Sequence, residues 1–89
     1  MDISFPHKKS THDARTTSVA FPVLVNGHTR RCLVTEEALL DHFGANSMES
    51  SHLEQVFESH RDEIEAIAQQ RFLSGATGDV FLRTQDFQD

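Results

Sequence analysis

The chain has 89 residues and a formal net charge of −6, from 14 Asp and Glu against 8 Lys and Arg. This length fits one small domain, whose thin margin of stability argues against a deep enclosed active site and favours association. Its single cysteine, Cys32, cannot form an intrachain disulfide or a CxxC site. No apolar run reaches the length of a signal peptide or the roughly 18–20 residues of a membrane helix, which predicts a cytoplasmic protein without membrane contact.

The charge is unevenly distributed along the chain. Residues 1–34 contain five Lys and Arg against two Asp, whereas residues 35–89 contain three Arg against twelve Asp and Glu. Solvated helix faces are one explanation of the acidic part, and a functional dipole that pairs two copies of the chain is the other. The acidic total argues against broad nucleic-acid binding, which requires a basic face.

The first half of the chain contains a strong hairpin signal. Residues 3–5 alternate like a short strand, and residues 6–17 are predicted to be a loop. Residues 18–34 form two β-rich runs around Asn26-Gly27, a pair that suits a type I′ turn. With a two-residue loop, the face assigned to the core consists of Val19, Phe21, Val23, Cys32 and Val34.

Pro22 tests the register of this hairpin. It falls on a non-hydrogen-bonded pair opposite Arg31, so its missing N–H points away from the partner strand. Because proline cannot donate to a second ladder, strand 18–25 is predicted to be an edge strand, at least near Pro22. Arg30 and Arg31 point to opposite faces of the sheet and are not expected to form one patch. Together with Lys8, Lys9 and Arg15 they are candidates for a basic edge.

Two helices are predicted after the hairpin. Thr35 is a good N-cap for a short helix over residues 36–43, with Gly44 at its C′ position. Residues 51–54 match a capping box that opens a long helix ending at Gly75. The apolar residues of this helix share one arc, part of which is expected to outrun the sheet and meet a partner chain.

The last strand candidate covers residues 80–84, and residues 85–89 are expected to fray. The order of elements predicts a single α+β domain over residues 1–89, with residues 1–17 partly in a loop. Its small, mostly antiparallel sheet contains the β-hairpin plus N- and C-terminal strands. A short and a long helix pack on one face of this sheet.

Five segments of the sequence are similar, in their order and spacing, to those of a known family: ISF, FPVLVNGHTRRCLVTEEAL, DHFGA, HLEQVFESHRDEIEAIAQQ and VFLRTQDF. Together they resemble a bacterial family of short uncharacterised proteins, domain of unknown function family 1488. The resemblance spans residues 3–87 and implies a bacterial origin and a compact α+β fold. It implies no activity, cofactor or substrate, because the family has none established.

Four residues are candidates for a ligand site or an interface. His60 falls in the middle of the apolar arc. One interpretation is a buried or interfacial structural histidine. The other is a pH-sensitive or ligand-contacting histidine in a groove between helix and sheet, near Cys32 or Arg30. Cys32 itself is interpreted as a small buried hydrophobe rather than a nucleophile. Arg71 lies further along the arc, where its long stem marks the end of burial.

The sequence contains no metal-ligand pattern, nucleophile elbow, P-loop or dinucleotide fingerprint, so no enzyme activity, cofactor or metal site is predicted. The leading hypothesis is a non-catalytic accessory or interaction protein that acts as a homodimer, through an open strand edge or the excess helical stripe, and has an unknown protein partner. The alternative is a nucleic-acid-associated regulator that uses the basic N-terminal segment and the hairpin. Its contacts would be Lys8, Lys9, Arg15 and Arg31.

Overall fold

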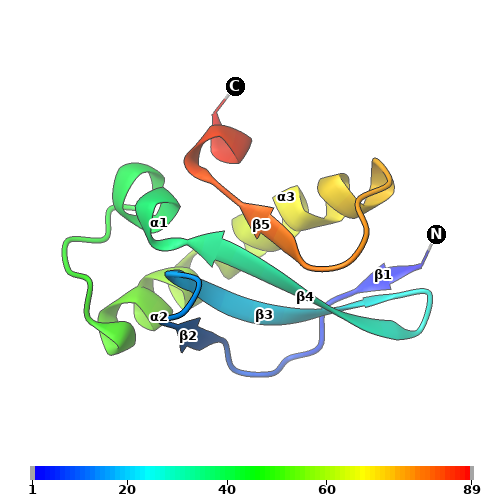
Figure 1. The fold of residues 1–89 in the computed structure, drawn as a ribbon, viewed down its shortest axis with the longest axis horizontal. Coiled ribbons are helices and arrows are strands. Elements are labelled where there is room, and N and C mark those ends of the chain that lie inside the picture. Colours follow the sequence, from blue (N-terminus) through cyan, green and yellow to red (C-terminus); the bar gives the residue numbers. More distant parts are fainter. Residues whose placement is uncertain (1, 89) are drawn as a thin grey trace.

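The computed structural model describes residues 2–88 and shows a twisted sheet with helices on one of its faces (Figure 1). The α+β fold predicted from the sequence is confirmed. The elements in chain order are β1 (Ile3–Ser4), β2 (Thr11–Asp13), β3 (Ser18–Val25), β4 (His28–Thr35), α1 (Glu36–His42), α2 (Ser50–Ser59), α3 (Arg61–Leu73), β5 (Val80–Leu82) and the 3₁₀ helix η1 (Thr84–Phe87).

The central hairpin of β3 and β4 has the predicted register. Its pairs run from Val25 opposite His28 to Ser18 opposite Thr35. Asn26 and Gly27 have φ values of 53° and 81°, the two positive angles of a type I′ turn. The predicted core face is confirmed, with side chains at most 1% exposed: Val19, Phe21, Val23, Cys32 and Val34.

The sheet is mixed rather than purely antiparallel. Its strand order is β1-β3-β4-β5, with β2 also paired to β3. β1, β2 and β4 all run antiparallel to β3, so the sheet is mostly antiparallel as predicted. β5 joins β4 in parallel, because the helices between them carry the chain back across the sheet to start in the same direction.

The outer side of β3 is paired except around Pro22. β1 pairs with Val25 and Leu24, and β2 pairs with residues 18–20. Within the described residues, the stretch 21–23 therefore has β4 as its neighbour on one side and none on the other. The edge-strand prediction is confirmed near Pro22 and wrong over the rest of β3. It failed there because β2, predicted as loop, contains only three residues and carries no alternation of apolar side chains.

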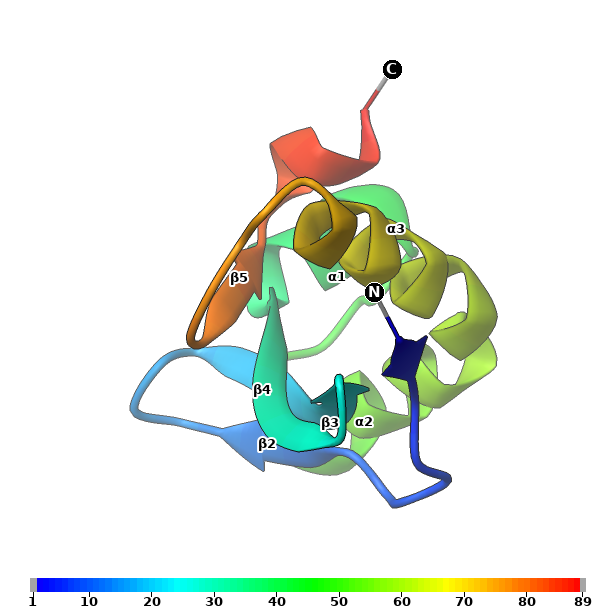
Figure 2. The same ribbon diagram turned by 90° about the vertical axis from the view of Figure 1, so that its right-hand side faces the viewer.

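The helices cover one face of the sheet and leave the opposite face open (Figure 2). The short helix α1 is confirmed, with Thr35 Oγ1 accepting a hydrogen bond from the Ala38 N–H at 3.1 Å. No helix within residues 2–88 combines the length and apolar character needed to cross a membrane. The core residues of α2 and α3 are at most 2% exposed, namely Leu53, Phe57, Ile64, Ala68 and Phe72. Val56 and Ile67 of the same apolar arc are half-buried, so contact of the arc with a partner chain stays a prediction.

A kink at His60 divides the predicted long helix into α2 and α3. His60 has φ −119° and ψ 20°, outside the helical range, although its carbonyl still accepts a hydrogen bond from the Ile64 N–H at 3.1 Å. The Ser59 hydroxyl donates to the Gln55 carbonyl at 3.0 Å, and such back-bonding of serine bends helices. The prediction of one continuous helix is therefore wrong. Residues 50–73 contain no Gly or Pro that would predict the bend.

The start of α2 also differs from the prediction. The helix begins at Ser50, after Glu49 as N-cap. The Ser51 hydroxyl donates to Glu49 Oε1 at 3.0 Å, and Glu54 Oε2 accepts the backbone N–H of His12 at 2.8 Å. The predicted capping box is wrong, because the Glu54 carboxylate binds β2 instead of its own helix terminus.

The C-terminal segment is ordered against the core. Residues 84–87 form η1, in which Asp86 Oδ2 accepts the backbone N–H of Arg83 at 2.8 Å. Phe87 is only 9% exposed, and its ring centroid lies 5.0 Å from that of Phe43. The expected fraying is wrong for residues 85–87, because burial of the Phe87 ring holds the segment; Asp89 lies outside the described residues.

Candidate functional site

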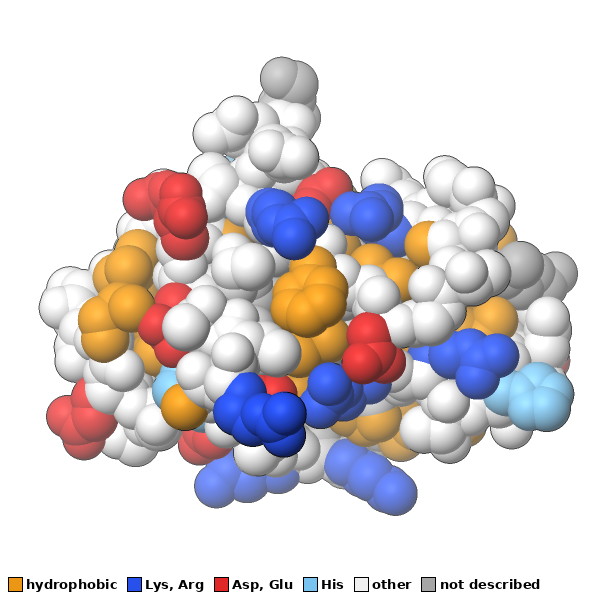
Figure 3. Space-filling model, viewed as in Figure 1, with side chains coloured by type: hydrophobic (Ala, Val, Ile, Leu, Met, Phe, Trp, Pro, Cys, Tyr) orange, Lys and Arg blue, Asp and Glu red, His pale blue; other side chains and the backbone are white. Residues whose placement is uncertain are grey.

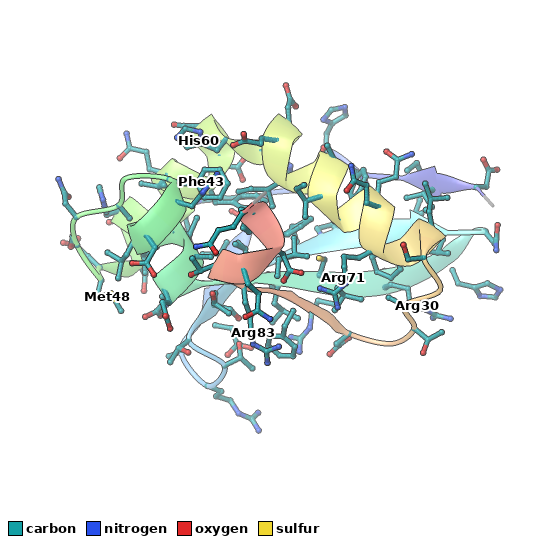
Figure 4. All side chains as sticks on the ribbon, turned by 90° about the horizontal axis from the view of Figure 1, so that it is seen from above. Arg30, Phe43, Met48, His60, Arg71 and Arg83 are labelled. Carbon is teal, nitrogen blue, oxygen red and sulfur yellow. The ribbon has the colours of Figure 1, made fainter. Side chains whose placement is uncertain are left out.

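The four interface candidates from the sequence lie in different environments. Arg30 is exposed on β4, and Cys32 is fully buried in the core. Arg71 leaves α3 toward the C-terminal segment (Figure 4), where its Nη1 donates to Asp86 Oδ1 at 2.9 Å and to the Phe81 carbonyl at 3.4 Å. Its side chain is 40% exposed, so it marks the limit of burial as predicted and fastens η1 and β5 to α3.

His60 is exposed, and the prediction that it lies buried in the apolar arc is wrong. The kink between α2 and α3 takes this residue out of the helical geometry on which the prediction depended. Its ring lies 5.0 Å from that of Phe43, at the opposite end of the molecule from Arg30 (Figure 4). The hollow that includes His60 is lined by residues 58–63 and contains neither Cys32 nor Arg30.

A hollow of about 850 Å³ lies on the open face of the sheet, beside the unpaired stretch of β3. Its lining includes the apolar side of Ala20 and Pro22. Figure 3 shows Lys and Arg side chains around apolar side chains on this face. We call this surface the basic hollow, after the four cationic residues in its lining: Lys8, Lys9, Arg30 and Arg31.

Arg30 and Arg31 both line the basic hollow with Lys8 and Lys9, although they are adjacent residues of β4, so these four cations border one hollow as a basic edge would. Among the four cations of the hollow, Arg31 has its charge balanced by carboxylates. Its guanidinium lies 3.1 Å from Asp79 Oδ2 and 3.7 Å from Asp13 Oδ2. Within residues 2–88, Lys8, Lys9 and Arg30 have no carboxylate at ion-pair distance. Three exposed cations thus face solvent beside an apolar floor, an arrangement that attracts anionic groups.

Arg15, the remaining cation of the proposed nucleic-acid set, is exposed in the turn between β2 and β3 and does not line the basic hollow. Its backbone N–H donates to Asp13 Oδ1 at 3.0 Å, and this bond is the main reason why the pKa of Asp13 lies below its usual value. Arg15 therefore offers a charge-matched comparison for the residues of the hollow.

A second cluster joins β2 to the starts of α1 and α2. His12 Nε2 lies 2.5 Å from Glu36 Oε2, and His12 Nδ1 lies 2.8 Å from Ser50 Oγ. The Glu36 and His12 side chains are 9% and 11% exposed, respectively. Sequence reasoning missed this cluster, because its members are far apart in the chain and stand in no local motif.

A third network ties the N-terminal segment to the helix kink. The Ser10 hydroxyl and backbone N–H donate to Glu58 Oε2 at 2.9 Å and 3.2 Å. Arg61 donates to Glu58, to Glu65 Oε2 at 2.8 Å and to the Pro6 carbonyl at 3.2 Å. Burial opposes ionisation of Glu58, but these hydrogen bonds and the guanidinium outweigh it and hold the pKa of Glu58 below its usual value.

Glu58→Gln is expected to remove part of the acid sensitivity of the protein. A carboxyl whose pKa is lower in the folded state stabilises the fold above its unfolded pKa, and this contribution is lost as the pH falls through the folded pKa. The difference in unfolding free energy between wild type and Glu58→Gln should therefore shrink on acidification. Urea denaturation measured from about pH 7 down to about pH 3 gives this difference.

Ser10→Ala is the matched variant for this prediction. It removes the hydroxyl donor to Glu58 but keeps the backbone N–H and the Arg61 guanidinium, so its acid sensitivity should lie between those of wild type and Glu58→Gln. A constant free-energy difference between wild type and Glu58→Gln across the whole pH range would contradict the network.

These features define a small α+β protein with a mixed sheet, helices on one face and a basic hollow on the other. A family model described as Protein of unknown function (DUF1488) matches residues 3–82, and the chain belongs to this family. The fold is similar to a crystal structure of a protein of unknown function from the same family in Shewanella loihica PV-4. The two share 24% sequence identity with a TM-score of 0.74, covering 92% of this chain and 94% of that one. A search of curated proteins found no match.

Proposed function

We propose that the protein is an interaction protein that binds acidic protein surfaces through the basic hollow, and that it acts as a homodimer. The observation that carries this proposal is the gathering of Lys8, Lys9 and Arg30 around an apolar floor, without carboxylate partners among the described residues. An acidic partner would neutralise these cations and cover the floor in the same step. Such complementarity raises the rate of association and selects the partner.

A second copy of the chain has the chemistry of such a partner. Residues 35–89 carry twelve Asp and Glu against three Arg, and Arg61 and Arg71 already bind carboxylates of their own chain. Asp62 and Glu63 are exposed on α3. Within residues 2–88, Met48 and Leu73 are the exposed large apolar residues, so electrostatic contact supports the dimer better than an apolar helix face.

Charge reversal at one residue of the hollow tests this proposal. Arg30→Glu is expected to weaken the dimer at least about tenfold, because it places like charge against an acidic partner. Arg15→Glu is the matched control, since it changes the net charge equally at an exposed site outside the hollow. Sedimentation equilibrium on the two variants gives both dissociation constants. Equal weakening by both would show that net charge, and not the hollow, governs association.

The alternative function is binding to nucleic acid, and one observation favours it. Lys8, Lys9 and Arg31 all line the basic hollow, so three of the four cations assigned to this role share a surface. Against it, Asp13 and Asp79 lie on the same surface and hold Arg31. A gel shift with single- and double-stranded oligonucleotides tests the alternative. Retardation that disappears when Lys8 and Lys9 are replaced by Ala would favour it over the acidic partner.

A further inference from the structure

Ser50, His12 and Glu36 form a hydrogen-bonded chain that leads from a buried carboxylate to an exposed hydroxyl. Glu36 Oε2 contacts His12 Nε2 at 2.5 Å, and His12 Nδ1 contacts Ser50 Oγ at 2.8 Å. We propose that this cluster is a nucleophilic site, at which Ser50 attacks acyl esters or thioesters and His12 accepts its proton. The proposal does not require binding at the basic hollow, although His12 also belongs to the lining of that hollow, and it departs from the expectation of a protein without enzyme activity.

The carboxylate determines which nitrogen of His12 carries the proton. Glu36 lies at the start of α1 and is 7% exposed, and its Oε2 is the hydrogen-bond partner of His12 Nε2. In the proposed site Nε2 carries the proton and donates it in this hydrogen bond. Nδ1 is then unprotonated and accepts a hydrogen bond from the Ser50 hydroxyl. A nucleophile, a base and a third group that orients the base are the arrangement that activates serine hydroxyls. Glu36 acts through His12 and is a positioning residue.

The backbone of His12 is also fixed. Its N–H donates to Glu54 Oε2 at 2.8 Å, and β2 pairs His12 with Val19 of the central strand. The imidazole is therefore held at both its backbone and its ring, and its side chain is 11% exposed. A base held in this way loses little entropy when it takes up the proton of Ser50.

Ser50 is placed where a substrate can reach it. It is exposed and is the first residue of the ten-residue helix α2, whose terminus has no side-chain cap. The backbone N–H groups of this first turn lie at the positive end of the helix and can stabilise a developing oxyanion. Because the Ser50 hydroxyl is exposed and not enclosed in a deep pocket, we expect it to react with short acyl groups, such as those of small activated esters and acyl thioesters.

The proposed reaction balances without a further reactant. Ser50 Oγ bonds to the acyl carbonyl carbon while its proton passes to His12 Nδ1. The bond from that carbon to the alcohol or thiol then breaks, and the leaving group takes the proton from the imidazolium. Water repeats the two steps on the acyl-serine, which releases the carboxylic acid and restores the Ser50 hydroxyl.

The competing explanation is that His12 only fastens β2 to α1 and α2. It predicts that Ser50 reacts no faster than any other exposed serine. Ser74, an exposed residue that follows α3, is the matched control, because no imidazole is hydrogen-bonded to its side chain among the described residues. The rate of acylation at these two positions separates the two explanations.

The experiment treats the full chain with p-nitrophenyl acetate and follows both p-nitrophenolate release and the acetylated residue by mass spectrometry. Acetylation at Ser50 is expected at least about a hundredfold faster than at Ser74, the usual minimum contribution of a general base. Ser50→Ala should abolish the fast release with an unchanged thermal midpoint, whereas Ser74→Ala should leave it intact. Equal rates at the two serines, or acetylation confined to lysines, would overturn the proposal.

Variants of the other two residues test their roles. His12→Gln should lose the fast acylation, and Glu36→Gln should lower the acylation rate constant while the concentration of half-saturation stays unchanged. Such a split is not expected from a merely structural role of Glu36. If either variant fails to fold, the comparison of Ser50→Ala with Ser74→Ala still decides the question.

Discussion

Phe57→Ala is expected to lower the free energy of unfolding by about 3–5 kcal/mol. Phe57 of α2 is 0% exposed, and its ring centroid lies 4.9 Å from that of Phe21 in β3. Its ring also lies 5.4 Å from the Arg61 guanidinium. Truncation therefore opens a cavity between helix and sheet, and the loss is a large part of the about 5–15 kcal/mol typical of a small domain. Urea denaturation followed by circular dichroism measures it.

Leu73→Ala is the control for this prediction. Leu73 is a large apolar residue at the end of α3, but it is 55% exposed, so its truncation should change stability by no more than about 0.5 kcal/mol. A Phe57→Ala variant as stable as Leu73→Ala would mean that α2 does not pack against the sheet as described.

Cys32 is expected to react with iodoacetamide at least about a thousandfold more slowly in the folded protein than in the unfolded chain. Burial raises the pKa of its thiol from 9.0 to about 12, and the thiolate is the reacting form. The side chain is also 0% exposed, which denies access to the reagent. Mass spectrometry of samples alkylated with and without urea measures the two rates.

Rapid labelling of native Cys32 would show that the sheet opens readily beside β5, its parallel neighbour. Slow labelling would leave Cys32 as a packing residue. In that case a ligand contact at Cys32 would require local unfolding of the core.

Local chemistry made the hairpin and the short helix predictable. Asn26-Gly27 requires two positive φ values and so determines the turn, the register and the buried face in one step. Thr35 caps α1 through its own side chain. In both cases the residues that specify the structure are neighbours in the chain, which is why the sequence alone is sufficient.

The features that were missed depend on partners distant in the sequence. β2 is a strand because it pairs with β3, and Glu54 serves β2 rather than its own helix. His60 lies at a bend to which the Ser59 hydroxyl contributes. The spacing of the apolar residues continues across this bend, so the sequence pattern did not predict it. The same reason explains why the Ser50–His12–Glu36 cluster could not be predicted, since three separate elements meet there only after folding.

Part of the basic hollow was foreseeable. The sequence makes five cations candidates for a basic edge, and four of them line the hollow: Lys8, Lys9, Arg30 and Arg31. The position of the hollow beside the unpaired stretch at Pro22 could not be predicted, because it depends on the pairing of both β1 and β2 with β3.

The mass of the native protein in solution tests the proposed association most directly. Multi-angle light scattering at micromolar concentration and low salt should give twice the chain mass of 10.1 kDa. The value should fall toward that of one chain as salt is raised, because exposed charges are screened beyond about 8 Å at physiological ionic strength. A mass of one chain at every salt and protein concentration would contradict the homodimer.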